Sequence, residues 1–187
     1  SEPAFLALWA VAAGWLFFRP HEYVLGAADA GVYVSIGASI AREGSIVVRD
    51  EALAALDEAL YPTLLRPQPD NPVAGYYLFP GFYVDGEPTG EITPQFYPLH
   101  PVWQAVAYSL VATTHSDALA VTPEAVRAAL LINGLWATLG CLAVYLTARQ
   151  FAGWETAALA LVALSATALQ VWFARYPTTE MLTQYLL

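Results

Sequence analysis

The sequence predicts an all-α integral membrane protein, a bundle of transmembrane helices with a long extracytoplasmic first loop that carries juxtamembrane helices. Hydrophobic residues make up 58% of the 187 residues and charged residues only 12%, about half the usual charged share of a soluble domain. The mean hydropathy is +0.49. Three apolar segments are candidates for membrane spans, and an acidic, proline-rich segment separates the first from the second.

The first candidate span is residues 1–18, in which Ala4 to Phe18 are uncharged and Arg19-Pro20 follow. These 15 residues cover roughly 22 Å at a rise of 1.5 Å per residue. A crossing therefore needs the residues before them, and we expect the chain to be part of a longer protein. The alternative is the apolar core of a signal peptide, but neither a basic n-region nor a small-residue cleavage site frames the segment.

The second and third candidate spans are residues 125–148 and 157–174. The second contains only Arg127 and Asn133 as strongly polar residues, and the third has no charge. Both lengths fit the roughly 20 residues that a transmembrane helix requires. The segments around them then become a cytoplasmic hairpin at 149–156, a second extracytoplasmic loop at 175–180, and the start of a truncated helix at 181–187.

The long segment between the first two spans, residues 19–124, is predicted to lie outside the cytoplasm. Its first part, residues 19–95, holds 11 acidic residues against 4 arginines. The positive-inside rule places loops rich in Lys and Arg in the cytoplasm, so it allows a loop this poor in them to lie outside.

Local patterns divide this loop. Apolar residues at helical spacing predict a helix from Asp29 to Arg42, with Gly44 as its C-cap. Leucines at the same spacing predict a second helix at Asp50–Leu60. Residues 61–95 are rich in Pro, Gly and Tyr and are expected to be irregular loop or short strand. Residues 96–112 predict a short, aromatic-rich helix along the membrane surface.

Composition also excludes two kinds of site. The basic residues are seven arginines with no lysine, and the formal net charge is −9. Nucleic-acid binding through a basic surface is therefore not expected. Cys141 is the single cysteine, which excludes an intrachain disulfide and a cysteine-cluster zinc site.

Two acidic residues, Asp29 and Glu180, are predicted to lie at helix–loop junctions beside apolar segments. Such groups cost solvation energy unless they serve a helix end, a cation or a reaction. The simpler alternatives are an N-cap for Asp29 and a first-turn carboxylate for Glu180. If residues 96–112 stay at the membrane surface, the two later spans bring the chain back to the side of the membrane on which the long loop lies. We then predict that both carboxylates face one polar cavity within about 10–15 Å, a scale comparable to paired-carboxylate sites; a full crossing by 96–112 would place them on opposite faces.

Several motifs follow one another in a recognisable order. They are Asp29 with Tyr33, Arg42-Glu43-Gly44, Tyr97-Pro98-Leu99-His100-Pro101, Arg127 at the opening of a span, and Arg175-Tyr176-Pro177-Thr178-Thr179-Glu180 after the third span. In this order the chain resembles the N-terminal part of GT-C glycosyltransferases. This polyprenyl-phosphate-sugar-dependent group includes protein mannosyltransferases and aminoarabinose transferases. The resemblance covers nearly the whole chain, but only the first part of such an enzyme.

The resemblance implies a cell-envelope transferase in the bacterial plasma membrane, active on the extracytoplasmic face. It would move a sugar from a polyprenyl-phosphate donor to a lipid, glycan or protein acceptor. Asp29 would act as general base on the acceptor hydroxyl. Glu180 would be the second acidic residue, although many relatives have Asp at that place.

The leaving lipid phosphate needs a cation. It is either a divalent metal ion held by Asp29 and Glu180 or the guanidinium of Arg175. The alternative for Arg175 is a snorkelling arginine at the end of a span. Tyr33 and His100 are the other predicted substrate-binding residues, and the alternative for His100 is a turn histidine packed under the surface helix.

A second interpretation of the whole chain is a non-catalytic membrane subunit of a larger complex, or a fragment of a transporter. Further spans and another external loop or domain in the complete protein would favour the enzyme. A complete protein without them would favour the structural role.

Overall fold

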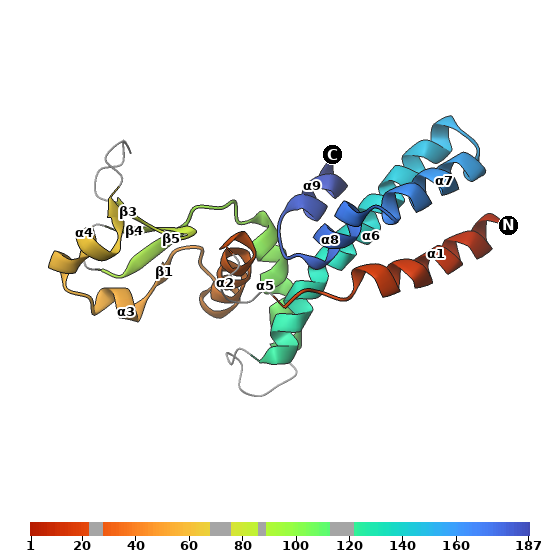
Figure 1. Ribbon diagram of the computed structural model, residues 1–187. Coiled ribbons are helices and arrows are strands. Elements are labelled where there is room, and N and C mark those ends of the chain that lie inside the picture. Colours follow the sequence, from red (N-terminus) through yellow and green to blue (C-terminus); the bar gives the residue numbers. More distant parts are fainter. Residues whose placement is uncertain (23–27, 68–75, 86–88, 113–121) are drawn as a thin grey trace.

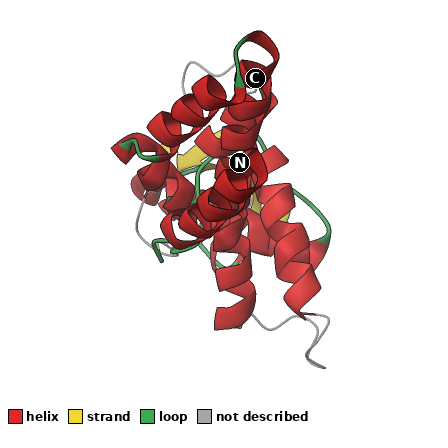
Figure 2. Cartoon of the chain, turned by 90° about the vertical axis from the view of Figure 1, so that its right-hand side faces the viewer, coloured by secondary structure: helices red, strands yellow, loops and turns green. Residues whose placement is uncertain are grey.

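The computed structural model describes residues 1–22, 28–67, 76–85, 89–112 and 122–187. Helices make up most of this part of the chain, and a small antiparallel sheet forms the rest of its regular structure (Figure 2). Figure 1 shows the sheet at one end of the molecule and a helix bundle at the other, with α2 (Ala28–Glu43) and α5 (Leu99–Ala112) between them.

The bundle is organised around α6 (Pro123–Phe151), against which α1 (Glu2–Phe17), α7 (Trp154–Ser165), α8 (Ala168–Arg175) and α9 (Glu180–Leu186) pack. The Thr122 hydroxyl accepts a hydrogen bond from the Ala125 N–H, and Pro123 occupies the first turn. This arrangement is a favoured start for a helix. The core combines large aromatic side chains with small residues that allow close approach, namely Trp9, Ala13, Phe17, Trp136, Ala137, Cys141, Tyr145, Ala157 and Leu161.

By length and composition, α6 is able to cross a membrane. Half of its most apolar stretch is buried inside the protein, so the same helix would also fit the core of a soluble protein. The shorter α1 has 16 residues and is apolar.

The prediction of one continuous helix over residues 157–174 is wrong. The chain bends by 62° between α7 and α8. The Thr167 hydroxyl donates to the Leu164 carbonyl and accepts from the Gln170 N–H. Thr167 therefore ends one helix and caps the next, and the two helices together form one broken apolar segment.

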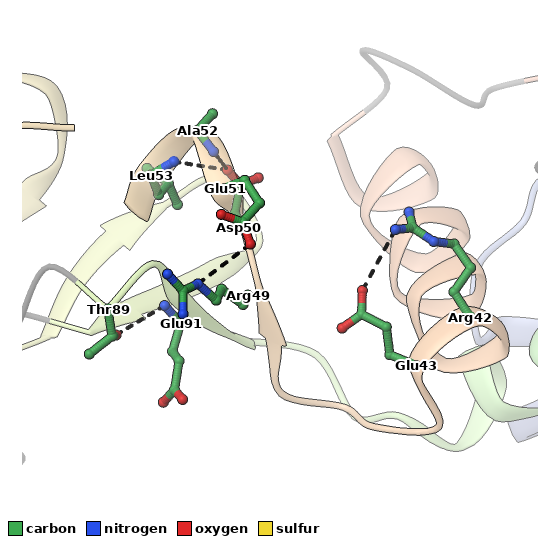
Figure 3. A network of polar contacts seen from close by, with 9 residues as sticks. All are labelled: Arg42, Glu43, Arg49, Asp50, Glu51, Ala52, Leu53, Thr89 and Glu91. Carbon is green, nitrogen blue, oxygen red and sulfur yellow. Dashed lines mark hydrogen bonds and ion pairs between the residues drawn. The ribbon is translucent and has the colours of Figure 1, made fainter. Parts of the chain in front are cut away.

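The two helices predicted in the long loop have different outcomes. The first is confirmed as α2, and Gly44 follows it with φ +68°. The second, at Asp50–Leu60, is wrong, because Asp50 and Asp57 each begin a separate turn by accepting backbone N–H bonds (Figure 3 shows Asp50). The resulting short helices are α3 (Glu51–Ala54), the 3₁₀ helix η1 (Glu58–Leu60) and α4 (Tyr61–Leu64).

The predicted helical architecture is confirmed in part, because the chain is mostly helical but also forms a small sheet. Its five antiparallel strands have the order β1-β5-β4-β3-β2, with β1 (Val48–Arg49), β2 (Arg66–Pro67), β3 (Tyr76–Phe79), β4 (Phe82–Asp85) and β5 (Glu91–Pro94). The short strands expected within 61–95 are confirmed, but their assembly into a sheet was not predicted. One face packs on Tyr61 and Leu65, which gives this part of the chain a core of its own.

The hairpin between β3 and β4 contacts α2 at its turn. Gly81 has φ +85°, and a Cβ atom built there would lie 2.3 Å from Cγ2 of Val32. Only glycine permits both this backbone conformation and this approach. The sheet is therefore seated on α2 one residue before Tyr33.

We expect Gly81→Ala to lower the free energy of unfolding by about 2–4 kcal/mol, because it adds a steric clash to an unfavourable φ. Gly44→Ala is the matched control, since Gly44 also has a positive φ but no atom within 4 Å of an added Cβ. Its cost should be only about 1–2 kcal/mol. Thermal and denaturant unfolding in detergent measure both, and equal losses would contradict the contact with Val32.

Candidate functional site

The candidate site is centred on Tyr33 of α2, whose side chain is 7% exposed. Its ring lies 5.0 Å from that of Phe96 and 5.8 Å, edge-on, from that of His100. Thr179, in the turn before α9, also affects the pKa of its hydroxyl. Two segments far apart in the sequence therefore meet at Tyr33: the first half of α2, and the chain from Phe96 to the beginning of α5.

The electrostatics of Tyr33 bring the two predicted acidic residues into the same site. Burial raises the pKa of the Tyr33 phenol, the hydrogen bond with Thr179 lowers it, and the negative charges of Glu180 and Asp29 raise it further. The phenol therefore keeps its proton at neutral pH and can donate a hydrogen bond. The charges of both carboxylates thus affect one phenol, and their predicted separation of about 10–15 Å stays a prediction.

Both carboxylates belong to the first turn of a helix. Asp29 is the second residue of α2 and Glu180 the first of α9, and both side chains are exposed. The N-cap alternative for Asp29 is wrong, because α2 begins at Ala28. The first-turn position proposed for Glu180 is confirmed, and the helix dipole favours a negative charge at both places.

His100 lies in the first turn of α5 and is completely buried. Neither ring nitrogen has a hydrogen-bond partner. Burial lowers the pKa of His100 to about 4, so the imidazole is neutral at neutral pH. It therefore cannot offer a positive charge to a phosphate there, but it can form a hydrogen bond to a substrate or help to hold Tyr33.

Arg175, the last residue of α8, forms hydrogen bonds with residues at and just after the end of α1. Its Nε donates to the Leu16 carbonyl at 2.7 Å, and its own carbonyl accepts from the His21 N–H at 2.9 Å. These hydrogen bonds give Arg175 a structural role at the end of α1, and they do not test the snorkelling alternative. Its predicted role as the cation for a phosphate stays a prediction that depends on the other guanidinium N–H groups.

A divalent metal ion at Asp29 and Glu180 would need further ligands that do not come from the protein, such as water or a substrate phosphate. In the described segments, no group of three or more His, Cys, Asp or Glu side chains is arranged to hold a metal ion. Carboxylate oxygens suit Mg²⁺ or Mn²⁺, which commonly keep water and phosphate ligands. A metal ion held by both residues therefore stays a prediction.

The sequence analysis selected His100 but not the two polar side chains that continue from it in a column along α5, Gln104 and Tyr108. His100, Gln104 and Tyr108 are spaced four residues apart, all are buried, and their polar side-chain atoms lack hydrogen-bond partners. Gln104 packs closely on Gly37 of α2, where an added Cβ would lie 2.9 Å from its Cβ. The spacing of these polar residues in an otherwise apolar helix was the available signal.

A cavity of about 230 Å³ lies elsewhere in the bundle, between α1 and the end of α7. Its lining is mostly apolar and includes Leu8, Ala12, Val162 and Ser165. None of the predicted site residues lines it. It is therefore distinct from the polar cavity that was predicted beside Asp29 and Glu180.

Comparison of the chain with protein-family models, with curated proteins and with solved structures finds no match in any of the three. The resemblance to GT-C glycosyltransferases therefore depends on the motifs of the chain itself.

Proposed function

We propose that the chain is part of a membrane glycosyltransferase that uses a polyprenyl-phosphate sugar. One observation carries the proposal: Asp29 and Glu180, which are far apart in the sequence, both act on the buried phenol of Tyr33 beside His100. An arrangement of two exposed carboxylates and a neutral hydrogen-bond donor suits the recognition and activation of a sugar or another hydroxyl-bearing acceptor.

In the proposed reaction, the acceptor oxygen attacks the anomeric carbon of the donor sugar. Asp29 takes the proton of that hydroxyl as the new glycosidic bond forms, and the bond from the anomeric carbon to the phosphate oxygen breaks. The polyprenyl phosphate leaves with the bonding electrons. Glu180 holds a cation near the phosphate or orients the acceptor, and Tyr33 donates a hydrogen bond to a substrate oxygen.

The distribution of side chains on α5 supports a membrane-surface position for the site. Large apolar side chains are exposed along this helix, while its polar column faces the protein interior. Water would favour the reverse arrangement, whereas a bilayer surface would cover the apolar stripe. The exposed residues are Leu99, Val102, Trp103, Val106 and Leu110.

The function is tested with the complete protein in proteoliposomes that contain polyprenyl-phosphate mannose as a donor probe. We expect sugar transfer to a mixed lipid, glycan and peptide acceptor fraction, with release of polyprenyl phosphate. Loss of transfer on addition of EDTA, and its recovery with Mg²⁺ or Mn²⁺, would favour the metal over Arg175. Donor binding without release of polyprenyl phosphate would instead favour the non-catalytic or transport interpretation.

The proposed topology places residues 19–124 outside the cytoplasm. We expect cysteines introduced at Glu58 and Gly153, both exposed positions, to react with a membrane-impermeant maleimide from opposite sides. The single native cysteine, Cys141, is buried, so unmodified protein gives the background. Labelling of both positions from the same side would contradict the topology.

A further inference from the structure

The exposed face of α1 changes in character along the helix. Leu8, Val11 and Trp15 are all exposed, and their spacing of three and four residues places them on one stripe. Arg19 follows four residues after Trp15, and its guanidinium carbon lies 4.4 Å from the centre of the Trp15 ring. The stripe therefore runs from aliphatic through aromatic to cationic side chains.

The neighbouring helix α8 carries side chains in the same order. Leu169 and Trp172 are exposed, Tyr176 stacks on Trp172 with ring centres 5.8 Å apart, and Arg175 is the last residue of the helix. Because α8 packs against α1, two helices that lie side by side each end in an aromatic residue and an arginine.

Backbone contacts bring the two arginines to the same end of these helices. The Arg175 carbonyl accepts from the N–H of His21 at 2.9 Å, two residues after Arg19. The Nε of Arg175 donates to the Leu16 carbonyl at 2.7 Å, three residues before Arg19. Two residues of chain span at most about 7 Å, and arginine side chains are long, so both guanidinium groups are within reach of one small anion.

The positive charge of this pair is not neutralised within the described part of the chain. Neither arginine forms an ion pair there, and the contacts described for Arg175 occupy one of the five N–H groups of its guanidinium. The acidic residue nearest in the sequence is Glu22, which is exposed. Two cations against one carboxylate leave a net positive charge at the end of two apolar helices.

The apolar cavity of about 230 Å³ adjoins this arginine pair. Leu16, whose carbonyl accepts from Arg175, is one of its lining residues, and so is Leu8 at the start of the α1 stripe. Trp9 and Ser165 line it too and hydrogen-bond to each other at 2.9 Å, so their polar groups are already satisfied. The cavity is smaller than most small-molecule pockets, and its apolar lining suits one segment of an alkyl chain.

The length of the stripe matches one leaflet of a bilayer. From Leu8 to the end of α1 at Phe17, the helix rises roughly 14 Å at 1.5 Å per residue. This rise is close to half of the roughly 30 Å hydrocarbon core. An alkyl chain that lies along the stripe therefore reaches the middle of the membrane when its polar end is at the arginines.

We propose that Arg19 and Arg175 bind the phosphate of an anionic membrane phospholipid, one of whose acyl chains enters the cavity between α1 and α7. The phosphate accepts charge-assisted hydrogen bonds from both guanidinium groups. Trp15 and Trp172 lie at the level of the headgroups, where tryptophan is enriched, and basic pockets between transmembrane helices are known to bind such headgroups. The lipid is a resident of the bilayer and not the sugar donor. The proposal depends on the membrane position of the chain and not on sugar transfer.

The first test titrates the delipidated complete protein in detergent with phosphatidylglycerol and, separately, with phosphatidylcholine. Native mass spectrometry counts the bound lipids. We expect one phosphatidylglycerol to bind before any others, and phosphatidylcholine to bind more weakly because its choline group cancels the charge of the phosphate. Inorganic phosphate should not displace the lipid, since it cannot fill the cavity. Equal binding of both lipids, or displacement by inorganic phosphate, would overturn the proposal.

The second test removes the arginines one at a time. Arg19→Gln and Arg175→Gln should each weaken the binding of phosphatidylglycerol roughly tenfold, because each removes a charged donor to the phosphate. Arg127→Gln is the matched control, since Arg127 is also an exposed arginine near the end of an apolar helix, and it should bind normally. Arg175→Gln also removes the contact with Leu16, so Arg19→Gln is the decisive variant. Unchanged binding in Arg19→Gln would contradict the site.

The third test fills the cavity and adds the donor lipid as a competitor. Ala12→Phe places a ring in the cavity and should weaken the binding of phosphatidylglycerol. Gly14→Phe on the same helix should not, because a Cβ atom at Gly14 has no other atom within 4 Å. Displacement by an equimolar amount of polyprenyl phosphate would assign the site to the donor and overturn the proposal. Binding of phosphatidylglycerol by a protein without transfer activity would support it while the proposed function fails.

Discussion

Asp29→Asn is expected to lower the kcat of sugar transfer by roughly 10²–10⁴-fold, the usual contribution of a general base. The amide has nearly the shape of the carboxylate but cannot accept the proton of the acceptor hydroxyl. Because Asp29 is exposed, the substitution should leave folding and membrane insertion intact. Release of polyprenyl phosphate by the complete protein in proteoliposomes measures the effect.

Asp50→Asn is the matched control for this substitution. Asp50 lies in the same loop and caps α3 through hydrogen bonds to Ala52 and Leu53 (Figure 3), which an asparagine oxygen can also accept. Its transfer activity should remain near that of the wild type. Glu180→Gln should weaken transfer less than Asp29→Asn if Glu180 only holds a cation. Full activity in Asp29→Asn would remove the base from the proposed mechanism.

Acidification is expected to destabilise the protein through His100. The pKa of His100 is about 4 in the folded state, against 6.5 for an ordinary histidine. Because the unfolded chain binds the proton more readily, this contribution to stability is complete above pH 6.5 and is lost as the pH falls toward 4. The free energy of unfolding should decrease by about 3 kcal/mol over this interval.

Unfolding of the protein in detergent, measured at several pH values, checks this expectation. His100→Leu has no titrating group at this position and should lose most of the pH dependence between 6.5 and 4. His21→Gln should retain it, because this substitution leaves His100 in place. The same pH dependence in wild type and His100→Leu would show that other groups carry the effect.

Several local elements could be predicted from the sequence because short-range signals specify them. The pattern of α2 and its terminal Gly44 appear in adjacent residues, and so does the long apolar run that became α6. The segments Tyr76–Phe79 and Phe82–Asp85, on either side of Pro80-Gly81, also have the pattern of a β-hairpin. The complete sheet is not visible in the sequence, because its outer strands β1 and β2 have only two residues each and almost no pattern of their own.

The candidate site shows the same division. Residue type and position relative to apolar segments selected Asp29, Tyr33, His100 and Glu180. The structure brings the rings of Tyr33 and His100 together, and the charges of Asp29 and Glu180 both raise the pKa of Tyr33; the roles of the four residues stay predictions. Residue type alone also suggested a cation at Arg175 and a ligand at His100. In the structure, Nε of Arg175 donates to the Leu16 carbonyl at the end of α1, and burial keeps His100 neutral; the predicted substrate-binding roles of both residues stay predictions.

By itself, the sequence determined where apolar helices form, where the acidic loop lies between them, and which polar residues are costly enough to need a role. Only the tertiary structure decided that the third apolar segment bends at Thr167, that five short strands assemble into a sheet, and that Asn133 holds the turn before Glu180. The physical reason is the distance along the sequence over which each interaction acts. Helical periodicity, capping and apolar length act within a few neighbouring residues, whereas burial and hydrogen bonding depend on which distant segments pack together.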